Sequence, residues 1–418
     1  MSVTSIVGRT AEERIDHRFA FLPPDATGLT ISELTAQGRN LFTGGFTAPV
    51  VTLPAQAVDH VLGQLQTCSA EYGIAFAPSG EVAMSPELFE RRGLDGLWGI
   101  TATSPHQVRV YRALGIQRIL LASELVDTGF LSWIAQELNA DTGFRFICYV
   151  DSVRGAELMD AGLREAGAIR PVDVMVELSA GKGARAGART RDECTRVADA
   201  VASSPALRLT GVAGHEGDVP RADYVAVSAW LRQLTALAAA FDKDCRFSEA
   251  DEITVSVSGR EWFEAVTDVL DIIPSLSKPV LKLLRSGAPG LNGQMPYGIR
   301  SGNQVAPATG FQLWTQVISC PELGQAIVSM ESRALAPSPG AYKVQSVRAC
   351  ESGHIRPATG ITVTSASGGH ASLKLDAGVH LEVGDWISLS LPLGFGTMDL
   401  VPLTEADGTV TSYVRTLS

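Results

Sequence analysis

From about residue 46 to residue 300, short apolar segments alternate with amphipathic segments of helical periodicity. Several apolar segments are hydrophobic almost throughout, which is typical of parallel strands buried on both faces. An unbroken series of strand–helix units favours a closed eight-stranded barrel. An open sheet stays an alternative. Such a sheet would need a dinucleotide-binding or phosphate-binding fingerprint after an early strand, and the sequence contains none. The expected strands are residues 49–53, 74–78, 97–101, 118–122, 144–151, 172–178, 207–214 and 253–258.

A length of 418 residues exceeds one compact core of ordinary size, so we expect a second domain. After about residue 300 the sequence changes to short β-prone segments separated by glycine, proline and serine. Segments of this kind are typical of an antiparallel β domain. The expected division is a barrel over residues 46–300 and a β domain that includes residues 301–418.

The charge of the chain argues against several partners. With 34 basic and 45 acidic residues the formal net charge is −11, and no cluster of lysine and arginine is present, so a nucleic acid would be repelled. No apolar run approaches the roughly 20 residues that cross a bilayer, and residues 1–20 carry charges where a signal peptide is apolar. We therefore expect a cytoplasmic protein with neither a nucleic-acid nor a membrane partner.

The six cysteines and seven histidines form no C-x-x-C, H-E-x-x-H or H-x-H pattern. A metal site therefore cannot be assembled from local sequence, and no metal is expected. A disulfide framework is not expected in a large cytoplasmic chain either.

In a barrel of this kind, the catalytic and binding residues lie at the carboxyl ends of the strands. Two helix starts near these ends are also predicted, because Asp151 and Ser152 can cap one helix and Thr190 with Glu193 forms a capping box for another. The segments that follow the strands are residues 77–86, 151–152, 177–187, 214–217, 258–261 and 285–287.

These segments, in this order, resemble the pyridoxal-phosphate family that contains D-serine dehydratase, D-threonine aldolase and bacterial amino-acid deaminases. The resemblance extends over most of the chain from Thr47 onward and includes residues 98–101, 105–107, 120–125 and 384–386. It implies an α/β fold in which a (β/α)₈ barrel of the alanine-racemase type is joined to an antiparallel β domain. It also implies that residues 1–45 pack on that β domain, and that in a homodimer the β domain of one chain closes the barrel mouth of the other.

The chemistry that the family shares is altered in this sequence. Family members form the internal aldimine on the lysine of a P-H-x-K-T motif, and the matching residues here are Ser79 at the histidine position and Glu81 at the lysine position. A carboxylate cannot form a Schiff base. The small G-G-S turn that cradles the cofactor phosphate is matched by Arg260 and Glu261, which add bulk and a carboxylate. The tyrosine of the family's G-Y-E-G motif is His215.

Zinc-dependent members of the family bind the metal through a His-x-Cys pair near the carboxyl terminus, and this chain has Leu391 and Leu393 at those positions. Three elements of the cofactor site and one of the metal site have therefore changed together. The resemblance, with these departures, predicts a fold relative that binds neither pyridoxal phosphate nor zinc, so no cofactor is expected.

Glu81 and His215 are the expected catalytic residues. Burial in a barrel mouth raises the pKa of a carboxyl toward neutrality, which suits Glu81 as a general acid or base. The imidazole of His215 exchanges protons near neutral pH. The alternatives are that Glu81 fills the former lysine position in a salt bridge with Arg185 or Arg260, and that His215 is structural.

A second set of residues is expected to bind the substrate. Arg185 matches an arginine of the family, and Arg260 can hold a substrate carboxylate at the former phosphate site. Lys182, in a glycine-rich loop, offers a relocated Schiff-base lysine, although an exposed loop lysine is the favoured alternative. The expected substrate-binding residues are Ser79, Arg185, Arg260, Glu261 and Tyr297.

Three functions stay open. The replacement of Lys, Gly, Ser and Tyr by ionisable residues favours a cofactor-independent enzyme with lyase, isomerase or cyclase chemistry on a small carboxylate-bearing substrate. The second function is that of a non-catalytic pseudoenzyme that binds a ligand or a partner subunit, which explains the lost cofactor residues with the fewest assumptions. The third is a pyridoxal-phosphate enzyme that uses Lys182 or holds the cofactor without a covalent link.

Overall fold

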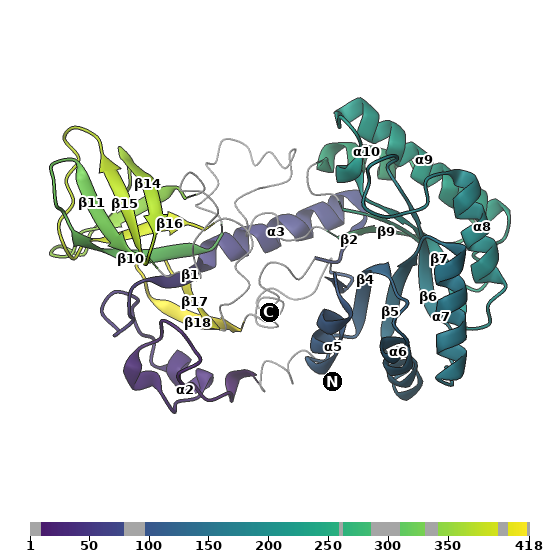
Figure 1. Ribbon diagram of the computed structural model, residues 1–418, viewed down its shortest axis with the longest axis horizontal. Helices are drawn as coiled ribbons and strands as arrows, with labels where there is room; N and C mark the ends of the chain where they lie inside the picture. The colour runs from purple at the N-terminus through teal and green to yellow at the C-terminus, as the bar shows by residue number, and fades with distance from the viewer. Residues whose placement is uncertain are drawn as a thin grey trace.

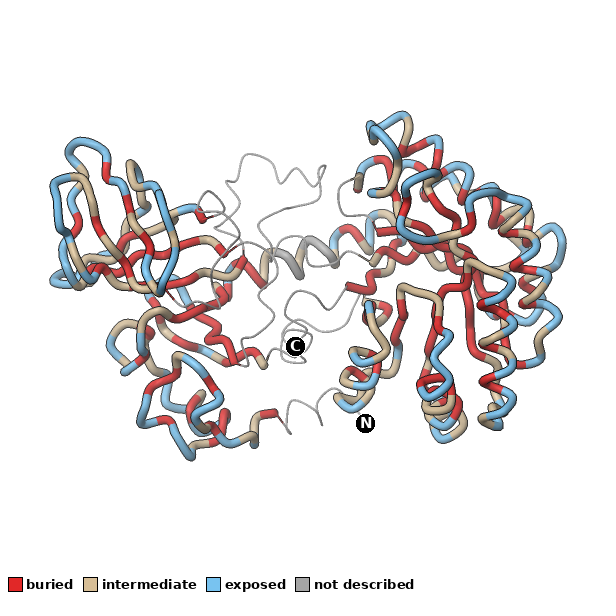
Figure 2. The backbone as a smooth tube through the Cα atoms, in the orientation of Figure 1, coloured by how far each residue is buried: buried red, intermediate tan, exposed pale blue. Residues whose placement is uncertain are grey.

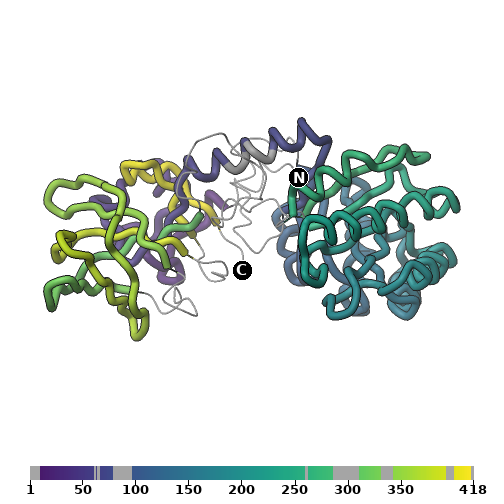
Figure 3. The backbone as a smooth tube through the Cα atoms, turned by 90° about the horizontal axis from the view of Figure 1, so that it is seen from above, coloured from purple at the N-terminus to yellow at the C-terminus, as the bar shows by residue number. Residues whose placement is uncertain are grey.

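The structure, a computed structural model, describes residues 10–78, 97–258, 262–285, 310–330, 342–391 and 400–415. The described strands form two sheets, one a ring of eight parallel strands covered by helices and the other a mixed sheet of ten strands (Figure 1). Helix α3 (Ala55–Tyr72) runs between them, from strand β1 (Val50–Pro54) of the mixed sheet to the first strand of the ring, as the view from above also shows (Figure 3).

The eight parallel strands close into a barrel. Their order around the ring is β2-β9-β8-β7-β6-β5-β4-β3, and the two ends meet where Phe76 pairs with Leu97. There the Trp98 N–H donates to the Phe76 carbonyl at 2.8 Å, and the Thr101 N–H donates to the Pro78 carbonyl at 2.9 Å. The expected closed barrel is confirmed, and the open-sheet alternative is wrong. The strands are β2 (Ile74–Phe76), β3 (Ile100–Ala102), β4 (Arg118–Glu124), β5 (Arg145–Val150), β6 (Val172–Leu178), β7 (Leu207–Gly214), β8 (Ile253–Val257) and β9 (Val280–Leu284).

The strand expected at residues 49–53 does not belong to the barrel, so this part of the prediction is wrong. β1 instead pairs antiparallel with β10 (Gln312–Ser319) and parallel with β17 (Leu400–Thr404). It is buried on both faces, because Val50 and Val51 belong to two different apolar clusters. A strand buried on both faces has the same apolar sequence in either sheet, so its pairing partner cannot be inferred locally. The eighth barrel strand is β9.

Helices α5 to α10 cover the outside of the barrel, and capping side chains explain where most of them begin. The capping box of Thr190 and Glu193 at the start of α8 is confirmed. Asp151 and Ser152 were predicted to cap α7. Ser152 does so by accepting a hydrogen bond from the Gly155 N–H at 2.9 Å, whereas the Asp151 carboxylate accepts one from the Gly187 N–H instead. The helices are α5 (Pro105–Ala113), α6 (Thr128–Ala140), α7 (Val153–Glu165), α8 (Arg191–Ala202), α9 (Tyr224–Lys243) and α10 (Phe263–Asp271).

The inner and outer faces of the barrel strands carry different apolar clusters. Alternate residues point into the barrel, where Tyr149, Met175, Ala213 and Leu283 form one buried cluster with Trp98. The residues between them point outward and pack under the helices. Figure 2 shows the barrel strands buried over most of their length. This alternation decides which side chain at each strand end faces the barrel mouth.

The second sheet has the order β13-β12-β16-β10-β1-β17-β18, and β11, β15 and β14 extend it from β10. The amino-terminal segment packs on it, because Ile15, Phe19 and Leu22 share a buried cluster with Trp314 and Trp386. The remaining elements of this part are η1 (Pro24–Ala26), α2 (Ile31–Ala36), β11 (Gln325–Ser329), β12 (Val344–Arg348), β13 (Ile355–Pro357), β14 (Ile361–Ser367), β15 (His370–Leu375), β16 (Trp386–Ser390) and β18 (Val410–Arg415).

Among the described residues, α9 is the helix that is long and apolar enough to cross a membrane by length and composition. Half of that stretch is buried inside the protein. Leu231 and Leu234 of α9 lie fully buried in the cluster between the barrel strands and the helices. The buried apolar residues of α9 are therefore explained by its packing on the barrel.

A network of ion pairs closes the amino-terminal end of the barrel. The Asp173 carboxylate, in a residue only 6 % exposed, accepts a hydrogen bond from Arg208 Nε at 2.7 Å and lies 3.9 Å from Arg145 Nε. Arg145 also pairs with Glu252 at 2.6 Å. Asp173→Asn is expected to lower the free energy of unfolding by about 3 kcal/mol, because it removes the buried partner of two arginines.

Urea denaturation measures this loss, with Glu252→Gln as the matched control. The Glu252 side chain is 28 % exposed, so its pair with Arg145 is screened by solvent, and the control is expected to lose about 1 kcal/mol or less. Equal losses in the two variants would contradict the role assigned to Asp173.

Candidate functional site

Strand alternation brings a set of polar side chains to the barrel mouth. On each strand, the residue two positions beyond an interior-facing one points the same way. Met175 faces the interior, so Glu177 faces the mouth at the end of β6. The same rule brings three more side chains to the mouth: His215 after β7, Arg285 after β9 and Asp151 after β5.

The guanidinium of Arg285 is held in place by neighbouring strands. Its Nη2 donates to the Gly214 carbonyl at 2.6 Å, and its Cζ lies 5.4 Å from the centre of the Tyr149 ring. Its Nε is shielded from solvent and has no hydrogen-bond partner among the described residues. A fixed guanidinium with an unused donor is suited to binding a carboxylate.

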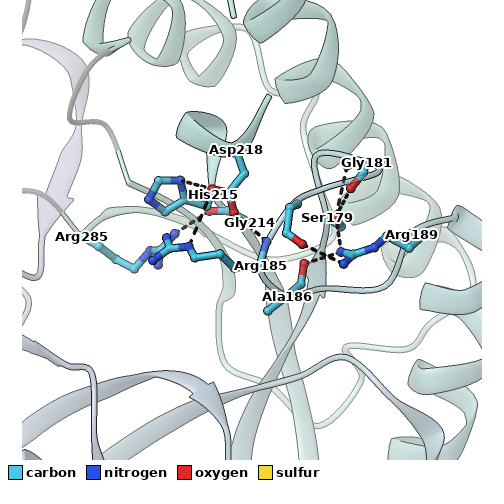
Figure 4. Close-up of polar contacts among 10 residues, drawn as sticks. Ser179, Gly181, Arg185, Ala186, Arg189, Gly214, His215, Asp218 and Arg285 are labelled. Atoms are coloured by element: carbon cyan, nitrogen blue, oxygen red, sulfur yellow. Dashed lines mark hydrogen bonds and ion pairs between the residues drawn. The ribbon is translucent and has the colours of Figure 1, made fainter. Parts of the chain in front are cut away.

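His215 lies beside Asp218 and Arg185 (Figure 4). Asp218 belongs to η2 (Glu216–Asp218), and its Oδ1 is 4.0 Å from His215 Nδ1 and 3.7 Å from Arg185 Nε. Burial and the nearby charge of Arg285 lower the pKa of His215, so its imidazole is neutral at pH 7 and can accept a proton. Of the predicted site residues, His215 and Arg185 are therefore brought together through Asp218, although the Arg185 side chain is 75 % exposed.

Glu177 is a functional candidate that the sequence analysis missed. It is partly buried, and no described residue donates a hydrogen bond to its carboxylate. Burial raises the pKa of Glu177 to about 7; the charges of Asp151 and Asp218 add to this effect, and those of Arg285 and Arg185 oppose it. A carboxyl with this pKa is half protonated near neutral pH, so it can act as an acid or as a base.

A usable signal for Glu177 and Arg285 does exist in the sequence. Both stand in the strand-end segments, at residues 177–187 and 285–287, but no role is predicted for either of them from the sequence. Counting alternate residues along the preceding strands places Glu177 on the same face as Met175 and Arg285 on the same face as Leu283, and the closed barrel shows that this face is the inner one. Their burial and their shared electrostatic field, in contrast, come from residues far away in the sequence.

Arg189 organises the glycine-rich loop that follows β6. Its guanidinium donates to Ser179 Oγ, to the Ala186 carbonyl at 2.7 Å and to the Gly187 carbonyl at 2.9 Å (Figure 4). The Gly187 N–H in turn donates to Asp151 Oδ2 at 2.8 Å. The Asp151 carboxylate therefore fastens this loop to the end of β5, which corrects its predicted role in the helix cap.

Several predicted site residues lie outside the part of the chain that the structure describes, so their roles stay predictions. They are Ser79, Glu81, Arg260, Glu261 and Tyr297.

The lysines show whether the residues present fit pyridoxal phosphate. The chain has six, all of them among the described residues, and none of them stands at an interior-facing strand end. Lys182 is an exposed residue of the loop after β6. The described strand ends therefore do not fit a cofactor that is bound through a lysine. The six are Lys182, Lys243, Lys278, Lys282, Lys343 and Lys374.

The described residues include no group of three or more His, Cys, Asp or Glu side chains arranged to hold a metal ion. Leu391, at the first of the two positions that the resemblance compares with zinc ligands, is buried and apolar. Leu393, at the second position, lies outside the described residues.

The barrel and the second sheet together have the alanine-racemase type of fold, as expected from the resemblance. D-threonine aldolase from Filomicrobium marinum matches with a TM-score of 0.66 and 19 % identity, over 89 % of this chain and 95 % of that chain. D-threo-3-hydroxyaspartate dehydratase from Delftia sp. HT23 matches with a TM-score of 0.66 and 19 % identity, over 90 % of this chain and 98 % of that chain. An alanine racemase-like protein from Idiomarina loihiensis matches with a TM-score of 0.62 and 12 % identity, over 89 % and 97 %.

No protein family and no curated protein matches the chain by sequence. At identities below 20 %, the likeness to the solved structures is a likeness of fold.

Proposed function

We propose that this chain is an enzyme that works without pyridoxal phosphate and without zinc, by acid–base chemistry on a small carboxylate-bearing substrate. Lyase, isomerase or cyclase chemistry suits such a site. The observation that carries the proposal is the set of groups at the barrel mouth: Glu177 with a pKa of about 7, the neutral imidazole of His215, and the guanidinium of Arg285. Because fold alone does not decide function, these groups and not the likeness of fold support the proposal.

In the proposed chemistry, one proton leaves the substrate and another is donated to it. The neutral imidazole of His215 accepts a proton from the substrate, and the protonated carboxyl of Glu177 donates one to a leaving group or to carbon. Arg285 holds the substrate carboxylate, which orients the reacting carbon. Glu81, at the position of the family's lysine, is proposed as a further acid–base group.

The remaining expectations are kept as parts of the same proposal. Ser79, Arg185, Arg260, Glu261 and Tyr297 are proposed to bind the substrate, with the exposed Arg185 at the rim of the mouth. The protein is proposed to be a cytoplasmic homodimer. Its barrel is proposed to lie within residues 46–300, and its β domain to combine residues 1–45 and 301–418 with strand β1.

The test follows hydrogen exchange at substrate carbon by NMR in D₂O. The similar structures named for D-threonine and D-threo-3-hydroxyaspartate make D-configured 3-hydroxy amino acids the first compounds to try, together with 2-hydroxy acids. The wild-type chain is expected to exchange or convert at least one of them. Loss of a proton-transfer group costs roughly 10²–10⁴-fold, so His215→Gln and Glu81→Gln should lose activity to this extent and keep the wild-type melting temperature.

His370→Gln is the matched control, because His370 is an exposed histidine on β15 of the second sheet, and it should retain full activity. If Glu81→Gln or His215→Gln stays fully active, the role of that residue is refuted. If the wild-type chain converts no compound, the pseudoenzyme alternative is favoured.

A second experiment tests whether the chain is a pyridoxal-phosphate enzyme. The protein is incubated with pyridoxal phosphate, reduced with borohydride and analysed by peptide mapping. A reduced adduct on Lys182 would overturn the cofactor-free proposal.

A further inference from the structure

We propose that the barrel mouth binds a small monocarboxylate at Arg285 and that Glu177 takes up one proton as this anion binds. The inference rests on the proposed function because it concerns the same site, but it requires binding only and not turnover. Three observations support it: the unused donor of Arg285, the charges that surround Glu177, and the balance of charges at the mouth.

Arg285 has the fixed position and the unused donor of an anion-binding residue. The Gly214 carbonyl takes one N–H of its guanidinium at 2.6 Å, and the fully buried Tyr149 ring lies 5.4 Å from its Cζ. Its Nε is shielded from solvent and lacks a hydrogen-bond partner among the described residues. A buried charged donor without a partner is unfavourable, and a carboxylate oxygen at this nitrogen would form a charge-assisted hydrogen bond.

Charged groups from four places in the fold act on Glu177. Asp151 at the end of β5 and Asp218 on η2 disfavour its ionised form, whereas Arg285 after β9 and Arg185 in the loop after β6 favour it. A carboxylate bound to Arg285 would offset the positive charge of that arginine and add a negative charge beside Glu177. Both effects favour the protonated form of Glu177, so the proton is taken up when the anion arrives.

Two other titratable groups at the mouth do not supply this proton uptake near neutral pH. Burial raises the pKa of Tyr149 to about 12, so its hydroxyl is already protonated. Burial and Arg285 lower the pKa of His215, so its imidazole is already neutral at pH 7.5. Of these described groups, Glu177, with a pKa of about 7, is the one that changes its protonation state in this range.

The balance of charges favours a monocarboxylate over phosphate. Of the described residues whose charges act on Glu177, Arg285 and Arg185 are positive, and Asp151 and Asp218 are negative. A monoanion bound with Glu177 protonated gives the mouth the same net charge as the unliganded mouth with Glu177 ionised. A phosphate dianion adds one further negative charge among these carboxylates, which is unfavourable at short distance.

Calorimetric titration with sodium propionate tests the inference, in two phosphate-free buffers that differ in ionisation enthalpy. At pH 7.5 the wild-type chain is expected to take up roughly 0.5–1 proton per bound propionate, since the free carboxyl is mostly ionised there. Its Kd should rise by up to about tenfold per pH unit above pH 7, as expected for one linked proton.

Two variants test the roles of Glu177 and Arg285 separately. Glu177→Gln is expected to bind propionate with a Kd that does not change with pH and without proton uptake. Arg285→Met should weaken binding at least about tenfold, because the charge-assisted hydrogen bond is lost. Arg154→Met, which removes a 75 % exposed arginine on α7, is the matched control and should bind as the wild type does. If Arg285→Met does not fold, as judged by circular dichroism, Glu177→Gln decides alone.

Unchanged propionate binding in a folded Arg285→Met chain, or retained pH dependence in Glu177→Gln, would overturn the inference. Tighter binding of inorganic phosphate than of propionate would do so too, and so would a lack of propionate binding by the wild-type chain in both calorimetry and ligand-observed NMR. Proton-linked binding without turnover in D₂O would reject the proposed enzyme and keep the anion site. Turnover without proton-linked binding would keep the enzyme and reject the anion site.

Discussion

Glu177→Gln is expected to lower turnover by roughly 10²–10⁴-fold and to leave the melting temperature nearly unchanged. Glutamine keeps the size and shape of the side chain but neither donates nor accepts the transferred proton. No described residue donates a hydrogen bond to the Glu177 carboxylate, so the substitution breaks no hydrogen bond within this part of the fold. The rate of substrate exchange or conversion, followed by NMR, measures the effect.

The pH dependence of turnover gives a second readout of the same residue. Wild-type kcat/KM is expected to fall as the pH rises through about 7, because the Glu177 carboxyl of the unliganded protein then loses the proton that it donates. On the acid side activity falls as His215 becomes protonated, at a pH below the ordinary imidazole pKa of 6.5. The optimum therefore lies between the lowered pKa of His215 and the raised pKa of Glu177, and Glu177→Gln should lose the basic limb.

Glu157→Gln is the matched control for this experiment. It makes the same change from carboxyl to amide on α7, where the Glu157 side chain is 57 % exposed, and it should keep both limbs of the profile. A basic limb that persists in Glu177→Gln would show that another group carries the proton.

Gly211→Ala is expected to destabilise the barrel by about 3 kcal/mol or more. Gly211 lies on β7 and pairs with Met175 of β6 and Thr254 of β8. A Cβ at this position would lie 2.0 Å from the Thr254 carbonyl oxygen, which is backbone and cannot move without shifting β8. Such a loss is a large share of the roughly 5–15 kcal/mol that stabilises an ordinary domain. Because His215 directly follows β7, the site is expected to be lost as well.

Gly129→Ala provides the comparison for this variant, with unfolding in urea as the measurement. Gly129 lies in the first turn of α6, and a Cβ there would meet no atom nearer than the Asp127 carboxylate at 3.4 Å. Alanine favours helix over glycine by up to about 1 kcal/mol, so this chain should be as stable as the wild type or slightly more stable. Similar stabilities for the two variants would contradict the close packing assigned to Gly211.

The sequence by itself determined the features that depend on neighbouring residues. Continuous apolar segments predicted strands at residues 172–178 and 207–214, and β6 and β7 have these bounds. The capping box of Thr190 and Glu193 was equally visible, because its hydrogen bonds join residues three positions apart. The alternation of apolar and amphipathic segments predicted the barrel, the β-prone segments after residue 300 predicted the second β domain, and the resemblance added the alanine-racemase type of fold. The predicted strand at residues 207–214 places His215 at its end, where the structure also has it.

The tertiary structure alone decided the features that depend on residues far apart in the chain. β1 has the apolar sequence of a barrel strand but pairs with strands more than 250 residues away, and pairing of that kind leaves no local signal. Glu177 becomes a proton-transfer candidate because burial, Asp151 and Asp218 raise its pKa. Arg285 becomes an anion site because β7 and β5 hold its guanidinium and leave its Nε without a partner among the described residues. The chemistry of both side chains is set by desolvation and charge from distant segments, which only the closed barrel brings together.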